Sequence, residues 1–325
     1  AGFYYKTFMW PASFWEKYEY FIRHSAGLGK APTKSDPDIY DHQYSHCDVL
    51  VVGGGISGII SAKLSAEKGL DTILIDDKSF LGGSTIYQEN ECYKINSVNS
   101  NKWLANEIES LKNYPNLLIK NRTSLAAFHG YNYLLARENL TDHLSINEKK
   151  GKVRQRLWKI RAKKVIIASG SIERPLIFSN NDRPGIILSS SIKKYIDYYG
   201  VKTGENISLF TNNDSAYETA ISLYKSGVKV NVIVDIRKNS DSLIVKEALE
   251  LGLKVLWEST VVDTQGYKRI KSFEVMKLSD DGNNVVGDRS KYNCDCLGIS
   301  GGWTPMVHLF TQSGGKLKFR NDDNV

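Results

Sequence analysis

The apolar and polar positions of the chain alternate in a way that predicts two strand–helix–strand units. The first unit runs from Cys47 to Asp77: an apolar strand "VLVV", a glycine turn, a helix ending near Gly69 and a second strand "TILI". The second unit is the stretch "NISLFTNNDSAYETAISLYKSGVKVNVIVDIR", residues 206–237. Strands that alternate with helices in this way predict parallel sheets covered by helices.

Between the two units the pattern changes to short β-rich runs. The runs "NLLIK", "TSLAAFHG", "YNYLLARE" and "VRQRLWKIRA" are separated by turn residues and predict an antiparallel meander. The nearly apolar "KKVIIASGS" that follows is typical of a strand buried in a parallel sheet. After the second unit come a helix in "SDSLIVKEALELG", a strand in "KVLWES", β-rich segments to about Val286, and the apolar "CLGIS" before "GGWTP".

These elements predict an α/β protein with a Rossmann-like fold of two dinucleotide-binding domains (FAD/NAD(P)-binding), three-layered, the second domain inserted into the first. Residues 1–46 are expected to form an aromatic-rich N-terminal arm and linker, with a helix from Ser13 to Ser25. Residues 47–175 and 295–325 would form the first dinucleotide-binding domain, its C-terminal end incomplete, and residues 176–294 the inserted, glycine-degenerate second domain. We expect the aromatic side chains of the arm to pack against a neighbouring domain.

The glycine turn of the first unit carries the strongest functional signal. Gly53, Gly55 and Gly58 occupy the GxGxxG positions directly after an apolar strand. The first glycine permits the tight turn, the second lets the backbone approach a pyrophosphate, and the third lets the helix pack close to the strand. The amino end of the helix then offers free N–H groups and its positive dipole to the phosphates.

The end of the second strand narrows the choice of cofactor. Asp76, which we place at a solvent-facing strand end, can accept hydrogen bonds from ribose hydroxyls and repels a 2′-phosphate, so NAD or FAD is favoured over NADP. Asp77 adds to this effect, and Lys78 slightly opposes it. The flexible loop with Gly83 and Ser84 could lie against the dinucleotide. From these residues alone, NAD and FAD both remain open.

The second unit lacks the glycines. Thr211, Asn213 and Ala216 occupy the three positions, and side chains at the first two obstruct a pyrophosphate. Asp235 still ends its second strand. We therefore expect a structural domain here and a single cofactor site in the first unit. Gly170, in "ASGSIERP", suits either a strand end near the cofactor or a hinge between domains.

Composition and charge exclude several classes of function. The 325 residues carry a net charge of +7, from 43 Lys and Arg against 36 Asp and Glu, but the basic residues are spread along the chain, so we expect no nucleic-acid binding. No window is apolar enough for a membrane helix. The histidines and serines form no metal-binding or nucleophile motif. Four cysteines without CxxC spacing favour a reduced, cytoplasmic setting with no metal site; they are Cys47, Cys92, Cys294 and Cys296.

Longer strings give the chain a resemblance to a known family. It resembles the alpha subunit of bacterial heterotetrameric sarcosine oxidase and the related N-methylglutamate dehydrogenase subunits. The likeness lies in "AGFYYKTFMWP", "CDVLVVGGGISG", "GGST", "ASGSIERP", "TNNDSAY" and "SGGWTPMVHL", and runs along essentially the whole chain. The resemblance implies oxidation of sarcosine to glycine, a CH–NH reaction of one-carbon metabolism, at a flavin on a partner subunit. It also implies FMN at the interface with that subunit, and beta-, gamma- and delta-like partners.

The resemblance also assigns residues. NAD would lie in the first domain, lined by the glycine turn with Ser57, by Asp76, Asp77 and Lys78, by Ser84, and by backbone near Ser124. Family members continue before and after this chain with ferredoxin-like and folate-binding parts, so we expect a fragment without folate binding, with impaired dinucleotide affinity and inactive alone.

Two alternatives come from other classes of protein. The chain could be a stand-alone FAD-dependent NAD(P)H or amine oxidoreductase of the disulfide-reductase architecture, although it has no CxxC and no second glycine turn. It could also be a scaffold that binds no nucleotide. The sequence assigns no catalytic residue under any of these readings.

Overall fold

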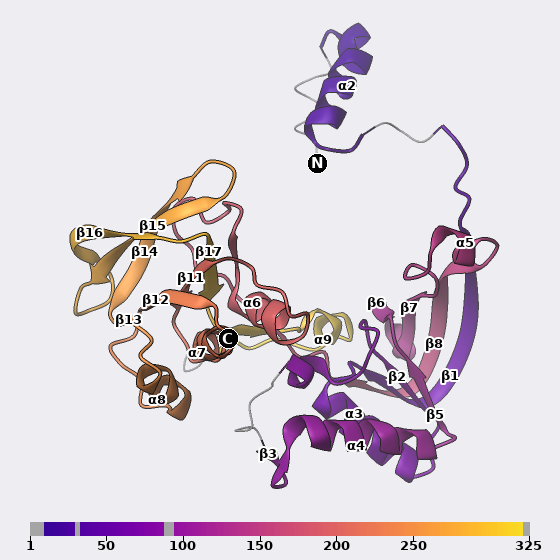
Figure 1. Ribbon diagram of the computed structural model, residues 1–325. Coiled ribbons are helices and arrows are strands. Elements are labelled where there is room, and N and C mark those ends of the chain that lie inside the picture. Colours follow the sequence, from indigo (N-terminus) through magenta and orange to yellow (C-terminus); the bar gives the residue numbers. More distant parts are fainter. Residues whose placement is uncertain (1–9, 30–32, 88–93, 321–325) are drawn as a thin grey trace. The chain divides into compact units, whose positions relative to one another are not determined.

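The computed structural model describes residues 10–29, 33–87 and 94–320 (Figure 1). Contacts divide the chain into two units: residues 1–40 with 141–154, and residues 41–140 with 155–325. Cys92 and most of the string "AGFYYKTFMWP" lie outside the described residues.

The smaller unit is mainly one helix. The short η1 (Ala12–Phe14) leads into α2 (Trp15–Ser25), so the helix predicted for the arm is confirmed. No residue of α2 is buried, and the aromatic side chains of Tyr20 and Phe21 are exposed. The unit also contains α5 (Ile146–Lys149), which begins with a capping box.

The first sheet of the larger unit has six strands in the order β5-β2-β1-β8-β7-β6. Strands β1, β2 and β5 are parallel, while β6, β7 and β8 form an antiparallel meander. The predicted meander is therefore confirmed for its last three runs and wrong for "NLLIK", which is β5 and pairs in parallel with β2, because a short apolar run does not encode the direction of its partner. The strands are β1 (Ile39–Val52), β2 (Thr72–Ile75), β5 (Leu117–Lys120), β6 (Thr123–His129), β7 (Tyr133–Asn139) and β8 (Val153–Ile167). The sequence suggested that the last meander strand and "KKVII" were separate, but they form one strand because no turn residue divides them.

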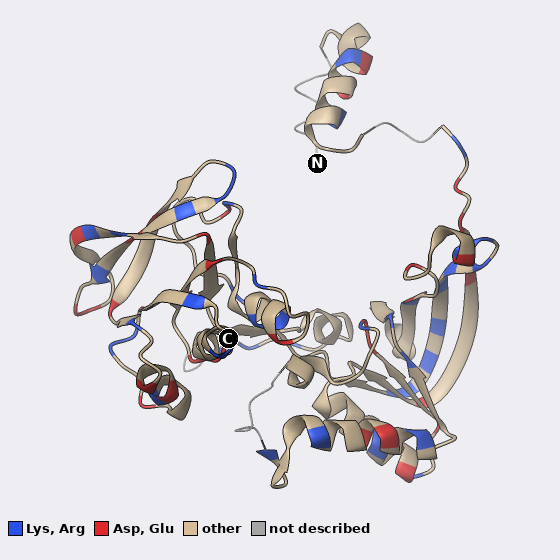
Figure 2. Cartoon of the chain, viewed as in Figure 1, with Lys and Arg blue, Asp and Glu red and all other residues tan. Residues whose placement is uncertain are grey.

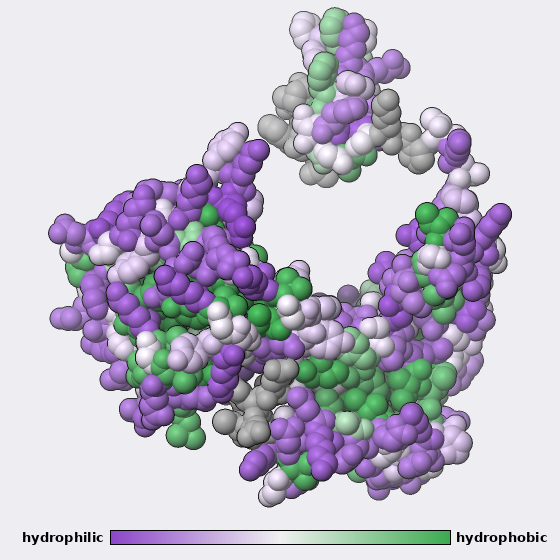
Figure 3. All heavy atoms as spheres, in the orientation of Figure 1, coloured by the Kyte–Doolittle hydropathy of each residue, from purple (hydrophilic) through white to green (hydrophobic). Residues whose placement is uncertain are grey.

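Helices cover one face of this sheet. Both α3 (Ile56–Glu67) and α4 (Ser100–Ser110) lie on the same side of it (Figure 1). Ile59 of α3 packs with Leu74 of β2 in a fully buried cluster, and each such side chain contributes about 1.5–3 kcal/mol by its burial. Residues of the meander pack against the other face of β1 and β2. Apolar surface is nevertheless visible over α3 and the neighbouring strands (Figure 3).

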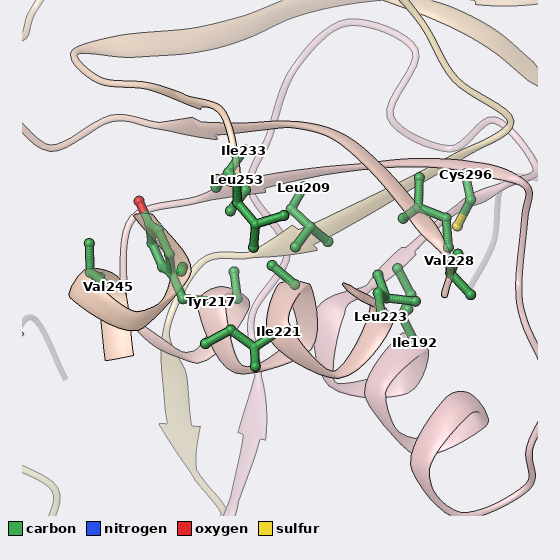
Figure 4. Packing of buried hydrophobic residues seen from close by; sticks show 14 residues of the cluster. Ile192, Leu209, Tyr217, Ile221, Leu223, Val228, Ile233, Val245, Leu253 and Cys296 are labelled. Atoms are coloured by element: carbon green, nitrogen blue, oxygen red, sulfur yellow. The ribbon is translucent and has the colours of Figure 1, made fainter. Parts of the chain in front are cut away.

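The second sheet has five strands in the order β10-β17-β11-β12-β13, paired in parallel. One face is covered by α6 (Ser189–Asp197), α7 (Ser215–Lys225) and α8 (Leu243–Glu250). Figure 4 shows Leu209 and Ile233 of the sheet packed against Tyr217 and Ile221 of α7. The strands are β10 (Ile186–Leu188), β11 (Asn206–Thr211), β12 (Lys229–Asp235), β13 (Val255–Leu256) and β17 (Cys296–Ser300).

Strand β17 differs from its expected place. A domain boundary at residue 295 places "CLGIS" in the first domain, but β17 pairs with β10 and β11 in the second sheet, so this prediction is wrong. All five of its residues are buried, and their apolar character satisfies either sheet equally well. Only the long-range pairing, which no local pattern encodes, decides between them.

Smaller elements complete the larger unit. An antiparallel sheet of β14, β15 and β16 packs on the second face of the five-stranded sheet. The strands β9 (Ser171–Glu173) and β18 (Trp303–Pro305) pair in a two-stranded antiparallel ribbon. Along the chain, β9 follows β8 of the first sheet and β18 follows β17 of the second sheet. The remaining elements are β14 (Ser259–Gly266), β15 (Ile270–Leu278), β16 (Val285–Asn293), α9 (His308–Gln312), η2 (Gly83–Tyr87), η3 (Leu111–Asn113), η4 (Gly130–Asn132), β3 (Lys94–Ile95) and β4 (Val98–Asn99).

The α/β, Rossmann-like character of both sheets confirms the fold class predicted from the sequence. Among the described residues, no helix is long and apolar enough to cross a membrane.

Candidate functional site

The glycine turn lies between β1 and α3, and two of its glycines are required by the protein itself. Gly53 has φ +109°, and a Cβ there would lie 2.3 Å from the carbonyl oxygen of Ala168. A Cβ on Gly58 would lie 1.7 Å from the carbonyl oxygen of Gly53. Both positions therefore exclude a side chain, and α3 sits close against the end of β1, as the spacing predicted.

Gly55 is different, because no neighbouring protein atom would clash with a side chain at this position. Its backbone is extended, and the nearest atom to a Cβ at this position would be the Cα of Gly83, at 3.9 Å. The space in front of Gly55 is open. Gly55 is also the N-cap of α3, and no side chain caps this helix. The first-turn amides, with the exposed Ser57 beside them, are thus placed to meet an anion such as a pyrophosphate.

Asp76 follows β2 and is tied to the glycine turn. Its Oδ2 accepts a hydrogen bond from the amide of Gly54 at 2.5 Å, and its Oδ1 accepts one from the amide of Lys78 at 2.8 Å. The side chain is partly buried and is thus less exposed than the solvent-facing position expected from the sequence. Burial raises the pKa of Asp76, while the hydrogen bonds from Lys78 and Gly54 oppose that rise. The carboxylate therefore holds the turn in shape and keeps acceptor capacity toward a ligand.

The two residues after Asp76 are more exposed. Asp77 and Lys78 form an ion pair with each other, the lysine Nζ lying 2.9 Å from Oδ2 of Asp77. Asp76 is therefore the carboxylate of this segment that is hydrogen-bonded to the glycine turn, whereas Asp77 is exposed and pairs with Lys78.

The loop after Asp77 lies against the glycine turn. The amide of Gly82 donates to the carbonyl of Gly54 at 2.8 Å, and a Cβ on Gly83 would lie 2.9 Å from the Cα of Gly55. Ser84, the next residue, is exposed. The structure thus brings this loop to the predicted site.

Two further predicted residues lie at strand ends near the turn. Thr123 donates its amide to the carbonyl of Asp76 at 2.8 Å, so Ser124 and the start of β6 adjoin the end of β2. Gly170 lies two residues beyond the close contact between Ala168 and the glycine turn. It has φ +69°, no neighbour within 4 Å of a Cβ, and a carbonyl that accepts from Met306. Its geometry fits a bend at the end of β8.

In the second strand–helix–strand unit, the turn between β11 and α7 is filled by its own side chains. Asn213 donates its Nδ2 to the carbonyl of Ser300 at 3.1 Å and accepts from the amide of Ser215 at 2.9 Å. The hydroxyl of Thr211 bonds the backbone of Asn213. Groups that a dinucleotide would contact are therefore already paired, which supports the prediction of a structural unit.

The carboxylate of Asp235, at the end of β12, also has all its hydrogen-bond partners within the protein. Asp235 is fully buried and accepts hydrogen bonds from the hydroxyl of Tyr217, at 2.7 Å, and from the backbone amide and two guanidinium nitrogens of Arg237. Burial, with the charge of Asp235 next, raises the pKa of Tyr217. A buried, paired carboxylate cannot serve a ribose without losing these partners.

The cysteines show no sign of metal or redox chemistry among the described residues. Cys47, Cys294 and Cys296 are free and buried, and no group of His, Cys, Asp and Glu in the described part of the chain could hold a metal ion. Burial raises the pKa of the Cys294 thiol to about 12 and that of Cys47 to about 11. Buried thiols with raised pKa values are poor nucleophiles.

The basic residues of β8 are largely paired. Lysines and arginines are spaced along this strand (Figure 2), and several meet partners on β1. Arg156 bonds Asp41 at 2.9 Å, and Lys163 bonds Asp48 at 2.6 Å. These pairs lower the density of unpaired positive charge on the sheet.

A cavity that the sequence patterns did not predict lies next to the loop that contains Gly83 and Ser84. It has a volume of about 340 Å³. Its walls come from η2, from the β9–β18 ribbon and from α6 and α7, and the lining residues are Ser84, Tyr87, Ser171, Glu173, Ser190, Lys193, Ser215, Glu218, Thr219 and Trp303. Only Ser84 among them was selected from the sequence. The others come from η2, β9, α6, α7 and β18, which are far apart in sequence, so no local spacing could have grouped them.

Comparisons with known proteins agree with this geometry. Residues 47–324 match the family described as pyridine nucleotide-disulphide oxidoreductase. The chain is 36% identical over 317 residues to the sarcosine oxidase subunit alpha of Rhizobium meliloti (strain 1021), an alignment that covers 97% of this chain. It is 35% identical over 294 residues, 90% of the chain, to the sarcosine oxidase subunit alpha of Corynebacterium sp. (strain U-96). The chain spans 30% of the length of each relative. The resemblance stated from the sequence is therefore confirmed.

Solved structures confirm the fold. L-proline dehydrogenase from P. horikoshii is similar with a TM-score of 0.61 and 21% identity, covering 90% of this chain and 49% of that one. Thioredoxin reductase from T. acidophilum is similar with a TM-score of 0.63 and 19% identity, covering 85% of this chain and 83% of that one. At these identities the likeness concerns the fold alone.

Proposed function

Because the chain belongs to the pyridine nucleotide-disulphide oxidoreductase family, we propose that its glycine turn between β1 and α3 binds NAD within an oxidoreductase of the sarcosine oxidase type. The observation that carries this proposal is the open space at Gly55, which lies between Gly53 and Gly58, two positions where the backbone leaves no room for a side chain. A dinucleotide pyrophosphate fits this position, since the uncapped amino end of α3 faces it.

The choice of NAD rests on charge and on the relatives. Asp76 lies beside the turn, where its carboxylate accepts hydrogen bonds from a ribose and repels a 2′-phosphate. Its oxygens each hold one amide and keep further lone pairs for a ribose hydroxyl. The curated relatives are alpha subunits of sarcosine oxidase, and the sequence resemblance to them extends along the whole chain.

In this proposal the chain binds and orients a dinucleotide, and the N-methyl amine would be oxidised on a partner subunit, where a flavin would supply the redox chemistry. Bound NAD supplies a nicotinamide that can exchange a hydride. The other subunits of a heterotetrameric oxidase, with FMN at the interface to one of them, belong to the same proposal. Ser57, Lys78, Ser84, Ser124 and Gly170 would line the dinucleotide together with the glycine turn and Asp76.

We further propose the two sheets as the cores of two dinucleotide-binding-type domains, the second without a ligand. The side chains of Asn213 and Arg237 support this division of roles, because they pair the groups that a second dinucleotide would use.

The test is identification of the cofactor that the purified protein carries or takes up. The protein is incubated with NAD and FAD, freed of unbound ligand and acidified, and the released cofactor is separated by chromatography. Recovery of NAD supports the proposal. Recovery of FAD alone, with a yellow protein absorbing at about 450 nm, supports the stand-alone flavoenzyme instead. Recovery of neither favours a scaffold without a nucleotide.

A further inference from the structure

The cavity beside the loop contains a buried carboxylate that is only half satisfied. Glu173, on β9, is 6% exposed. Its Oε2 accepts a hydrogen bond from the amide of Ser190, in the first turn of α6, at 2.8 Å. Its Oε1 is buried and has no hydrogen-bond partner among the described residues. An unpaired buried carboxylate oxygen is costly, so a donor from a ligand would stabilise this arrangement.

The neighbouring lysine does not supply that donor. Lys193 also lines the cavity and is 8% exposed, but its Nζ donates to the carbonyl of Tyr87 at 2.6 Å and to Oδ2 of Asp197 at 2.7 Å. The lysine is thus held away from Glu173 by two other acceptors. The carboxylate therefore favours a ligand group that donates N–H and disfavours a second anion.

The same cavity offers a wall suited to a flat ring. Trp303 is the cross-strand partner of Glu173 in the β9–β18 ribbon. Its Nε1 donates to the hydroxyl of Ser215 at 2.9 Å, which fixes the indole at the edge of α7. An indole held in this way provides apolar surface for a planar heteroaromatic group next to the carboxylate.

The cavity adjoins the dinucleotide site. Ser84 lines it, and the preceding residue, Gly83, lies against Gly55 at the glycine turn. A volume of about 340 Å³ falls within the range of small-molecule sites. A dinucleotide whose pyrophosphate meets Gly55 would therefore find this cavity beside the loop that contains Gly83 and Ser84.

We propose that the cavity receives the nicotinamide end of the dinucleotide, and that the free Oε1 of Glu173 accepts a hydrogen bond from its carboxamide. This inference rests on the proposed function. Glu173 is then a specificity-determining residue, which selects a carboxamide over a carboxylate at the same ring position.

The experiment measures calorimetric dissociation constants for three ligands: NAD, nicotinic acid adenine dinucleotide and ADP-ribose. The second ligand differs from NAD in carrying a carboxylate in place of the carboxamide, and the third lacks the ring. The wild-type protein is expected to bind NAD about tenfold or more tightly than the carboxylate analogue. In Glu173→Gln the preference should fall to about threefold or less, because a glutamine amide can donate to a carboxylate. Glu109→Gln, which alters an exposed glutamate of α4 paired with Lys112, should keep the wild-type ratio.

The outcomes separate this inference from the proposed function. If ADP-ribose binds but wild-type protein binds NAD and its carboxylate analogue equally, the role of Glu173 is overturned while the glycine-turn site stands. An unchanged ratio in Glu173→Gln overturns it as well. If none of the three ligands binds, both proposals fail.

Discussion

The carboxylate of Asp76 accepts a hydrogen bond from the amide of Gly54, so the acid at the end of β2 and the glycine turn after β1 form one structure. A carboxylate in this place fixes the glycine turn, and in the proposed dinucleotide site it would also present negative charge beside a ribose. Its partial burial, which raises its pKa, is the consequence of the first role.

The raised pKa of Asp76 predicts a pH dependence. A carboxyl whose folded-state pKa lies above the unfolded value of 3.8 is less favourable to folding when ionised. Its unfavourable contribution should shrink as the pH falls through the raised pKa. Urea denaturation from pH 7 down to pH 4 gives the free energy of unfolding of the wild type and of Asp76→Asn. The difference, wild type minus variant, should therefore increase as the pH falls. A difference that is constant or decreases over this window contradicts the raised pKa.

The glycine turn predicts that the same Gly→Ala substitution costs much more stability at Gly58 than at Gly55. Gly58→Ala should lower the free energy of unfolding by about 2–3 kcal/mol, because its Cβ meets the carbonyl of Gly53 at 1.7 Å. Gly55→Ala should cost less than about 1 kcal/mol, since the space there is open. Urea denaturation of the two variants compares them directly. Equal losses would mean that Gly55 is also required by the protein's own packing.

The buried ion pair of Asp235 with Arg237 predicts a large loss of stability when the arginine is replaced. Arg237→Met leaves the fully buried Asp235 carboxylate without its cation and should lower the free energy of unfolding by about 3–5 kcal/mol. The matched control Arg289→Met breaks a more exposed pair with Glu274 and should cost about 0–1 kcal/mol. A small loss in both variants would show that Asp235 does not depend on Arg237, and would weaken the structural role given to the second unit.

Burial of Cys294 predicts very low thiol reactivity. With a pKa of about 12, its thiolate at pH 8 is about four orders of magnitude rarer than the thiol. Iodoacetamide should leave Cys294 unmodified in the native protein at pH 8 and label it rapidly in urea, as followed by peptide mass spectrometry. Rapid labelling of the native protein would contradict the buried position.

Local sequence patterns predicted the parts of this molecule that depend on local geometry. The spacing of Gly53, Gly55 and Gly58 is tied to one turn and one helix, so their positions follow from the sequence. The alternating runs predicted both parallel units for the same reason. The helix at the arm was equally local.

The rest depends on pairings between distant segments. β17 is apolar on both faces and suits either sheet, so its partners could not be inferred from its residues. Glu173 is a single acid in a short strand, and only the folded chain brings it to Trp303, Lys193 and Ser84. The partial burial of Asp76 arises from its contact with Gly54, which is 22 residues away in sequence.

The most direct test of the central claim, that the turn after β1 binds NAD, is a calorimetric titration of NAD into wild-type protein and Gly55→Ala. The account predicts saturable binding of one NAD per chain in wild type. It also predicts at least about tenfold weaker binding in Gly55→Ala, because the added methyl group occupies the space that a pyrophosphate would use. Equal affinity of the two proteins, or no binding of NAD to wild type, would contradict it.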